Sequence, residues 1–199
     1  MQLVILASGR GSRLNRKTKK IPKCLVKLKN KSIIDYNLKF YKKFKKKIII
    51  TGYKSHLLKK KFMNNNFKFV ENKKFSSTNM VYSLFCASKI INQSLVVCYS
   101  DIIFDYKIYK KLTKNTTSIV VKNNWYNYWK KRMSNKKILD DAEDLVIRKG
   151  YVNSIGGKIG KKLPKCQFMG LVKIKYKDFR SLKIFFTKLK NKKIDFTNF

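Results

Sequence analysis

The first 25 residues place the strongest constraint on what this chain can fold into. Gln2–Leu6 is a short apolar run, which predicts a buried strand, and it breaks at once into a glycine-containing stretch at 7–14. Gly9 and Gly11 permit a tight turn with uncovered backbone N–H groups, which suits the close approach of a phosphate. Cationic donors for the same anion are Arg10, Arg13 and Lys23. The stretch therefore predicts a strand followed by a phosphate-binding loop.

The spacing in this loop excludes two familiar phosphate loops. A P-loop ends in Gly-Lys-Ser/Thr, whereas this chain has Gly11-Ser12-Arg13. A dinucleotide-binding loop has a third glycine at the position that Leu14 occupies. A glycine-rich turn with solvated basic residues remains an alternative, but it does not explain the Pro22-Lys23 pair that follows.

Leu6–Leu14 followed by Pro22-Lys23 resembles the signature of nucleoside-triphosphate transferases with the sugar-nucleotidyltransferase fold. The resemblance implies that Lys23 and Arg13 are catalytic, with Lys23 stabilising charge at the α-phosphate. It also implies a set of nucleotide-binding residues, which are Leu6, Ala7, Ser8, Gly9, Gly11, Ser12, Arg13, Lys23, Asn79 and Ser100.

Strand-like and helix-like segments alternate through residue 121, which predicts an α/β fold with three layers: a mostly parallel central sheet and helices on both faces. A small β-rich acceptor-binding segment follows. The expected strands are Gln2–Leu6, Lys46–Thr51, Phe67–Glu71, Leu95–Tyr99, Ser118–Val121 and Gln167–Ile174, with a hairpin at Leu145–Ile155 turning at Lys149-Gly150. The expected helices are Lys31–Phe44, His56–Phe62, a helix from Asn79 to Ile91, Asp105–Thr113 and Asp178–Leu189.

Asp101 is the candidate magnesium ligand. It follows the apolar strand Leu95–Tyr99, and ligands of such sheets bind at the carboxyl ends of the strands. Mg²⁺ takes one or two carboxylates together with substrate phosphates. The alternative is that Asp101 caps the next helix.

Further motifs resemble one branch of the family, the phosphocholine cytidylyltransferases and their relatives that act on 2-aminoethylphosphonate or phosphoglutamine. Those motifs run from Thr78–Leu84 through Tyr99–Ile102 to Gln167–Leu171. The branch implies CTP as donor and a small phosphorylated or phosphonate amine as acceptor, with release of pyrophosphate. The acceptor-binding candidates are Trp125, Trp129, Arg132, Asp141, Glu143, Gln167 and Asp195. The alternative for this region is a loop with solvated acids and a satellite aromatic cluster.

Two other functions compete with cytidylyl transfer. A sugar-1-phosphate nucleotidyltransferase would not need the acidic and aromatic middle segment. A basic nucleic-acid-binding module would suit the net charge of +39 but leaves the loop and Asp101 unexplained. The 43 lysines are spread along the chain, as expected for a compositional bias, so we expect no specific nucleic acid as partner.

Length and composition complete the expectations. The 199 residues predict a single nucleotidyltransferase domain, with a nucleotide-binding half at 1–121 and an acceptor-binding half at 122–199. The family pattern continues after a segment like Lys193–Thr197 into a strand with a second magnesium-binding carboxylate, so we expect this chain to lack its C-terminal end. No apolar run could span a membrane, and four scattered cysteines fit reduced thiols in the cytoplasm. A homodimer is left open.

Overall fold

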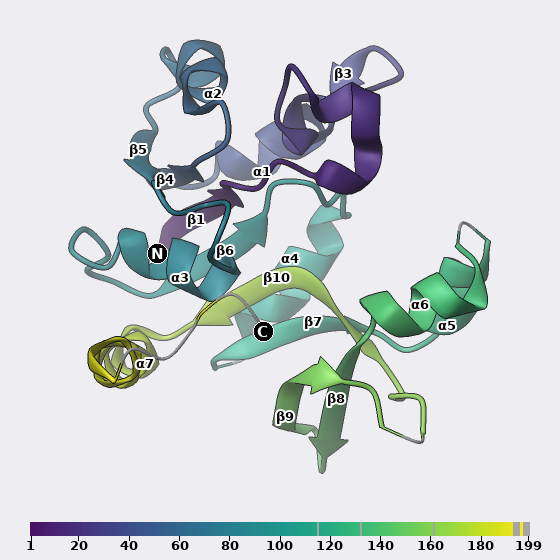
Figure 1. Cartoon of the computed structure of the whole chain (residues 1–199). Coiled ribbons are helices and arrows are strands. Elements are labelled where there is room, and N and C mark those ends of the chain that lie inside the picture. The colour runs from purple at the N-terminus through teal and green to yellow at the C-terminus, as the bar shows by residue number, and fades with distance from the viewer. Residues whose placement is uncertain (115, 132, 161, 193–195, 197–199) are drawn as a thin grey trace. The chain divides into compact units, whose positions relative to one another are not determined.

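The computed structural model describes all residues except 115, 132, 161, 193–195 and 197–199. The chain divides into two compact units (Figure 1). The first contains 1–118 and the described part of 170–198, and the second contains 119–169. The expected division placed the whole of 122–199 in one half, whereas the segment after Gly170 clusters with the first unit.

The central sheet has six strands in the order β5-β4-β1-β6-β10-β7. Strands β5, β4, β1 and β6 pair in parallel, and β10 pairs antiparallel with β6, so the prediction of a mostly parallel sheet is confirmed. The strand bounds are β1 (Gln2–Ala7), β4 (Lys46–Thr51), β5 (Lys68–Glu71), β6 (Leu95–Tyr99), β7 (Ser118–Lys122) and β10 (Gln167–Ile174). A small two-stranded sheet consists of β2 (Lys27–Leu28) and β3 (Lys31–Ser32).

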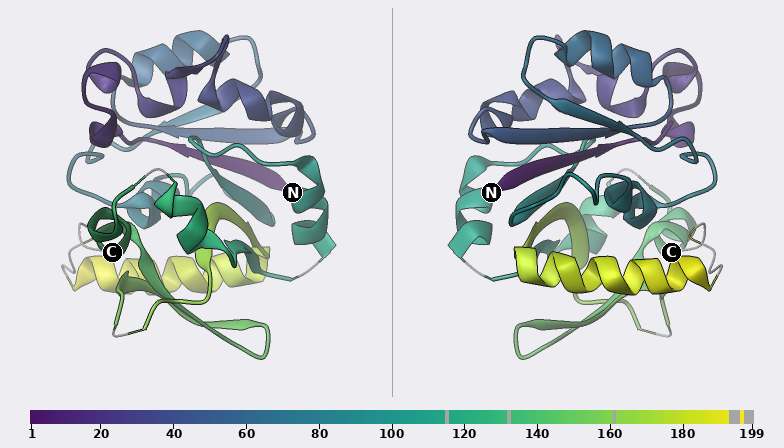
Figure 2. Two further views of the ribbon diagram at one scale, coloured as in Figure 1. Left: turned by 90° about the vertical axis from the view of Figure 1, so that its right-hand side faces the viewer. Right: turned by 90° about the vertical axis from the view of Figure 1, so that its left-hand side faces the viewer.

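Helices cover both faces of this sheet. The α-helices of the first unit are α1 (Leu38–Tyr41), α2 (Ser55–Phe62), α3 (Met80–Cys86), α4 (Tyr106–Lys114) and the long α7 (Tyr176–Asn191), which Figure 2 shows in yellow. Short 3₁₀ helices are η1 (Ser12–Thr18), η2 (Lys23–Leu25) and η3 (Ile33–Asn37). Along each helix of the described chain, no segment is long and apolar enough to cross a bilayer.

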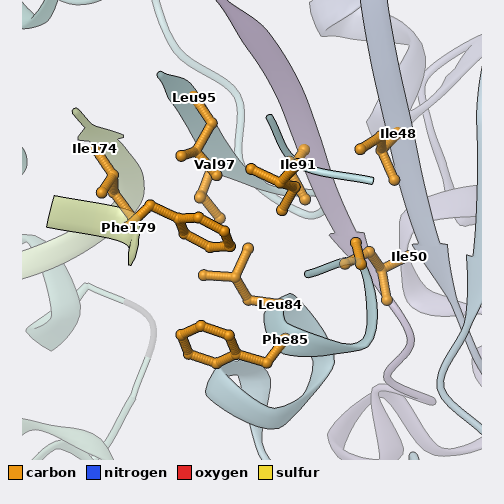
Figure 3. Close-up of a cluster of buried hydrophobic side chains, with 11 residues drawn as sticks. Ile48, Ile50, Leu84, Phe85, Ile91, Leu95, Val97, Ile174 and Phe179 are labelled. Carbon is orange, nitrogen blue, oxygen red and sulfur yellow. The ribbon is translucent and has the colours of Figure 1, made fainter. Parts of the chain in front are cut away.

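Successive side chains of each strand point to opposite faces of the sheet, so apolar residues pack against the helices on both faces. On one face, Val97 of β6 packs with Leu84 and Phe85 of α3, and Phe179 of α7 stacks on Phe85 with ring centroids 5.6 Å apart (Figure 3). On the other face, Phe40 of α1 packs edge-on against Tyr109 of α4 at 4.9 Å. The sheet is thus the middle of three layers.

Two expected helices differ from the structure. The helix expected over 31–44 begins instead as β3 and η3, although the Ser32–Asp35 capping box is present. Buried Asn37 has φ −98° and ψ 7° and donates its side-chain N–H to the Ile102 carbonyl at 2.6 Å, so a tertiary hydrogen bond interrupts the α-helix. Helix α3 ends at Cys86 rather than Ile91, because Gln2 bonds the Ile90 carbonyl and so holds that segment in turns.

The second unit contains the expected hairpin, formed by β8 (Glu143–Arg148) and β9 (Tyr151–Lys158). Lys149 and Gly150 both have positive φ, 49° and 80°, as a tight two-residue hairpin turn needs. The unit also has two helices that we did not expect, α5 (Trp125–Lys130) and α6 (Asn135–Asp141). The segment expected to be β-rich is therefore mixed.

Candidate functional site

The candidate site lies in the first unit, where three neighbouring parallel strands end. Strands β4, β1 and β6 are adjacent, with Ala7 opposite Thr51 and Leu6 opposite Tyr99. The Ser100 N–H donates to the Leu6 carbonyl at 3.1 Å and extends this pairing by one residue beyond the strand. The loop after β1 and the turn after β6 therefore leave the sheet side by side, as the parallel topology predicts.

The loop turns sharply at Gly11. Gly11 has φ +74°, and the Leu14 N–H donates to its carbonyl at 3.0 Å. A side chain at Gly11 would meet Lys23, because an added Cβ would lie 2.5 Å from the Lys23 Cβ. Fully buried Thr18 donates its hydroxyl to the Gly11 carbonyl at 3.0 Å. Glycine at this position therefore serves both the turn and the packing of Lys23.

Gly9 differs from Gly11 in its surroundings. An added Cβ at Gly9 would meet no atom within 4 Å, so the protein itself gives no steric reason for glycine there. Open space over exposed backbone is what a phosphate needs to reach N–H groups closely. Ser12 and Arg13 on the same loop are exposed, whereas Leu6 and Ala7 belong to β1.

Lys23 and Asp101 form an ion pair, with Nζ 2.5 Å from Oδ2. Their side chains are 41% and 27% exposed, so both charged groups remain accessible. Pro22 is buried and extended (φ −67°, ψ 153°) and fixes the chain immediately before Lys23. The structure thus brings together a lysine and an aspartate that the sequence predicted to serve one triphosphate.

Cys24 follows Lys23 in the chain and is close enough to Asp101 to feel its charge. Burial, with a smaller contribution from the negative charge of Asp101, raises the pKa of its thiol to about 12, although a hydrogen bond with Ser100 acts in the opposite direction. The thiol is therefore neutral at physiological pH and packs as a small apolar group. Ser100 is itself buried, with 7% of its surface exposed.

Asn79 caps helix α3. Its Oδ1 accepts from the Tyr82 N–H at 3.1 Å, which fixes the orientation of the amide, and its backbone N–H donates to the Phe196 carbonyl at 2.9 Å. Its side-chain Nδ2 is buried and has no hydrogen-bond partner among the described residues. Asn79 is therefore the N-cap of α3, while a direct role toward the nucleotide stays a prediction.

A buried polar network that the sequence did not indicate supports the start of the loop after β1. Asn72, which is 1% exposed, donates through Nδ2 to the hydroxyls of Thr78 and Ser83, each at 3.0 Å. The Ser83 hydroxyl lies 2.9 Å from that of Ser8 at the start of the loop. The network joins the end of β5, helix α3 and the start of the loop after β1. Its hydrogen-bonded pairs are 6 to 75 residues apart in sequence, so no local pattern could reveal the whole network.

The second unit contains most of the expected acceptor-binding residues. Trp125 and Trp129 are 1% and 9% exposed, and the Trp125 indole N–H donates to the Pro164 carbonyl at 2.8 Å. Gln167 is buried and uses both ends of its amide on the backbone of Glu143, at 2.6 and 3.2 Å. The burial and hydrogen bonds of these three side chains are explained by packing within the unit. An acceptor-binding role for them stays a prediction.

Asp141 ends helix α6 and Glu143 begins β8, so the two acids flank Ala142 at the junction of these elements. Both are partly exposed. Arg132 and Asp195, which the sequence also assigned to the acceptor, lie outside the described residues.

The metal prediction can be compared with the donors that are present. Among the residues that the structure describes, no group of three or more His, Cys, Asp or Glu side chains could enclose a metal ion. Asp101 is a partly exposed carboxylate that follows β6, the strand next to β1 and its loop. Such a donor set fits a magnesium ion that takes most of its ligands from substrate phosphates and water.

Comparison with known proteins identifies the family of the chain. A family model described as the MobA-like NTP transferase domain matches residues 3–150. CTP:phosphoglutamine cytidylyltransferase of Campylobacter jejuni is 36% identical over 188 residues, covering 88% of this chain and 74% of that protein. Choline-phosphate cytidylyltransferase of Streptococcus pneumoniae is 29% identical over 164 residues, covering 80% and 67%.

Solved structures show the same fold. A structure of CTP:phosphocholine cytidylyltransferase from Streptococcus pneumoniae superposes with a TM-score of 0.74 at 22% identity, covering 99% of this chain and 80% of the other. An inositol-1-phosphate CTP transferase from T. maritima gives 0.69 at 19% identity, covering 88% and 71%. The fold is that of these nucleotidyltransferases. The chain belongs to the family of MobA-like NTP transferase domains.

Proposed function

We propose that this protein transfers a cytidylyl group from CTP to a small phosphorylated or phosphonate amine and releases pyrophosphate. The observation that carries the proposal is the Lys23–Asp101 pair beside the glycine-rich loop, in a chain 36% identical to a CTP:phosphoglutamine cytidylyltransferase. The second relative is also named for a cytidylyl transfer to a phosphorylated acceptor.

In the proposed reaction an oxygen of the acceptor phosphate or phosphonate attacks the α-phosphorus of CTP. The bond from the α-phosphorus to the bridging oxygen breaks, and that oxygen leaves with pyrophosphate. Negative charge builds up on the α-phosphoryl oxygens, and preorganised cationic donors stabilise it. Lys23 and Arg13 are the donors we assign to this role, and backbone N–H groups near Gly9 and Gly11 bind the rest of the triphosphate.

Asp101 is the residue that we propose to hold magnesium, which when bound neutralises charge on the phosphate oxygens. Lys23 shares this carboxylate, so it leaves Asp101 when a phosphate attracts it more strongly. For the acceptor, Asp141 and Glu143 are the acids suited to an ammonium group.

The test is a matrix of donors and acceptors with pyrophosphate release as the signal. CTP, UTP, ATP and GTP are each combined with phosphocholine, 2-aminoethylphosphonate, phosphoglutamine and glucose 1-phosphate. Release with CTP and an amine acceptor supports the proposal. Release with glucose 1-phosphate and another triphosphate would overturn it in favour of a sugar-1-phosphate nucleotidyltransferase. A gel shift with random RNA at rising salt measures non-specific binding to polyanions separately.

A further inference from the structure

Tyr53 contacts the phosphate loop at both of its ends. Tyr53 lies two residues after β4, and its backbone N–H donates to the Ser8 carbonyl at 2.9 Å. Its phenolic O–H donates to the Lys19 carbonyl at 2.6 Å. Ser8 and Lys19 bound the segment that contains the glycines and η1, so one residue links the start of the loop to its end.

The ring of Tyr53 contacts a cation from the middle of the same loop. The guanidinium carbon of Arg10 lies 5.7 Å from the ring centroid, within the range of a cation–π interaction. On the described part of the chain, none of the ion pairs involves Arg10. The aromatic ring restricts where this side chain lies while its N–H groups can still bind an anion.

Gly52, the residue before Tyr53, allows the chain after β4 to come close to Ser8. An added Cβ at Gly52 would lie 2.7 Å from the Ser8 carbonyl oxygen and 2.6 Å from the Cβ of Phe75. Glycine therefore allows the end of β4 to approach the loop closely. Phe75 in turn packs against the Tyr53 ring, with centroids 6.0 Å apart.

We propose that Tyr53 is a positioning residue for the triphosphate, which fixes the two ends of the loop and the direction of Arg10. The loop needs this support because its interior contains a left-handed residue at Gly11 and a non-helical one at Asn15 (φ 45°, ψ −115°). A loop held in its binding conformation loses less conformational entropy when the ligand arrives, so its affinity is higher. The identity of the ligand rests on the proposed function, whereas the support of the loop does not.

The first test uses Tyr53→Phe, which removes the hydrogen bond to Lys19 and keeps the ring. Tyr36→Phe is the matched control, because the Tyr36 phenol also donates to a backbone carbonyl, that of Leu28, at 2.6 Å. Hydrogen exchange of the segment 8–19 is measured by mass spectrometry without nucleotide. We expect faster exchange in Tyr53→Phe, unchanged exchange in Tyr36→Phe, and similar melting temperatures for both.

The second test measures triphosphate binding and turnover in the same variants. Loss of one neutral hydrogen bond corresponds to roughly a three- to tenfold change in an equilibrium constant. We expect Tyr53→Phe to raise the Kd and KM for CTP by about that factor with kcat changed less than about threefold. The Tyr36→Phe control should keep both constants.

A third comparison tests the ring. Tyr53→Leu should weaken CTP binding more than Tyr53→Phe does, because Arg10 loses its aromatic contact. Arg10→Ala should then weaken CTP binding less in the Tyr53→Leu background than in the wild type, since contacting residues are energetically coupled. Fully additive effects would contradict the role of the ring.

The outcomes separate this proposal from the proposed function. Wild-type exchange of the segment 8–19 in Tyr53→Phe would overturn the positioning role, whatever the substrate. Faster exchange in a protein that binds ATP or UTP in place of CTP would support the positioning role and count against cytidylyl transfer. An equal loss of affinity in Tyr36→Phe would show that the effect is general destabilisation and would also overturn the proposal.

Discussion

Lys23 Nζ lies 2.5 Å from Asp101 Oδ2, so the cation assigned to the α-phosphate neutralises the carboxylate assigned to magnesium. A divalent cation that binds Asp101 through Oδ2 competes with this ammonium group. A triphosphate that attracts Lys23 releases the carboxylate, so nucleotide and metal should bind with positive coupling. This relationship allows Lys23 and Asp101 to be tested separately.

For Lys23 we predict opposite effects of Lys23→Ala on turnover and on metal binding. Turnover should fall roughly 100- to 1,000-fold, because one preorganised donor to the transition state is lost. The affinity for Mn²⁺ measured without nucleotide, by electron paramagnetic resonance, should rise, because Asp101 loses its competitor. The control is Lys59→Ala, which breaks the ion pair with Glu71 at 3.0 Å and should change neither quantity. Near-normal turnover in Lys23→Ala would contradict its catalytic assignment.

Asp101→Asn should abolish metal-dependent turnover while the melting temperature stays within a few degrees of the wild type. An amide of the same shape keeps the packing near Cys24 but binds a hard cation poorly. Mn²⁺ titration and thermal melting measure the two effects. A variant that never reaches a folded state would show instead that Asp101 has a structural role.

Gly9→Ala and Gly11→Ala should have different effects, the first on CTP binding and the second on the stability of the fold. Gly11→Ala should lower the free energy of unfolding by about 1 kcal/mol or more, because its φ is +74° and the new Cβ would collide with Lys23. Gly9→Ala meets open space, so its melting temperature should be unchanged while its Kd for CTP rises. Unchanged CTP binding in Gly9→Ala would remove Gly9 from the phosphate contacts.

Much of the fold could be predicted because its strands are short apolar runs rich in β-branched residues. Lys46–Thr51, Leu95–Tyr99 and Gln167–Ile174 were predicted with the bounds that the structure shows. The loop could also be predicted, because its glycines and the spacing from Gly11 to Lys23 lie within one short stretch of sequence. The prediction of a continuous helix over 31–44 was wrong because a distant partner determines the backbone conformation there. The Asn37 side chain donates a hydrogen bond to a carbonyl 65 residues away.

The same reason explains which site residues were missed. Thr18, Tyr53 and Asn72 support the loop through hydrogen bonds with residues that are not their neighbours in sequence, such as Lys19, which is 34 residues from Tyr53. A tyrosine after a strand and an asparagine in a polar loop are ordinary residues in a single sequence. Their roles emerge once the parallel pairing of β1 and β4 brings the ends of those strands together.

The buried network beneath Ser8 provides a further prediction. Asn72→Ala should lower the free energy of unfolding by about 1–3 kcal/mol, because the Thr78 and Ser83 hydroxyls lose a buried partner. It should also raise the KM for CTP, because Ser83 supports Ser8. Chemical denaturation and steady-state kinetics measure both. The control is exposed Asn64→Ala, which should alter neither.

Asp35 provides a prediction about pH. Burial raises the pKa of its carboxyl, but hydrogen bonds from Lys61 and Ser32 outweigh burial, so the pKa lies below the ordinary value of 3.8. A carboxyl with a lowered pKa stabilises the fold above its unfolded-state pKa, and this contribution disappears as the pH falls through the folded-state pKa.

Asp35→Asn should therefore lower the free energy of unfolding at pH 7. We expect a decrease of about 1 kcal/mol, because the capping box is lost and the ion pair with Lys61 is partly exposed. The difference from the wild type should shrink as the pH falls below 3.8, as measured by urea denaturation from pH 7 to 3. Exposed Asp140→Asn is the matched control, and a difference for Asp35→Asn that stayed constant across this range would show that packing, and not charge, explains the loss.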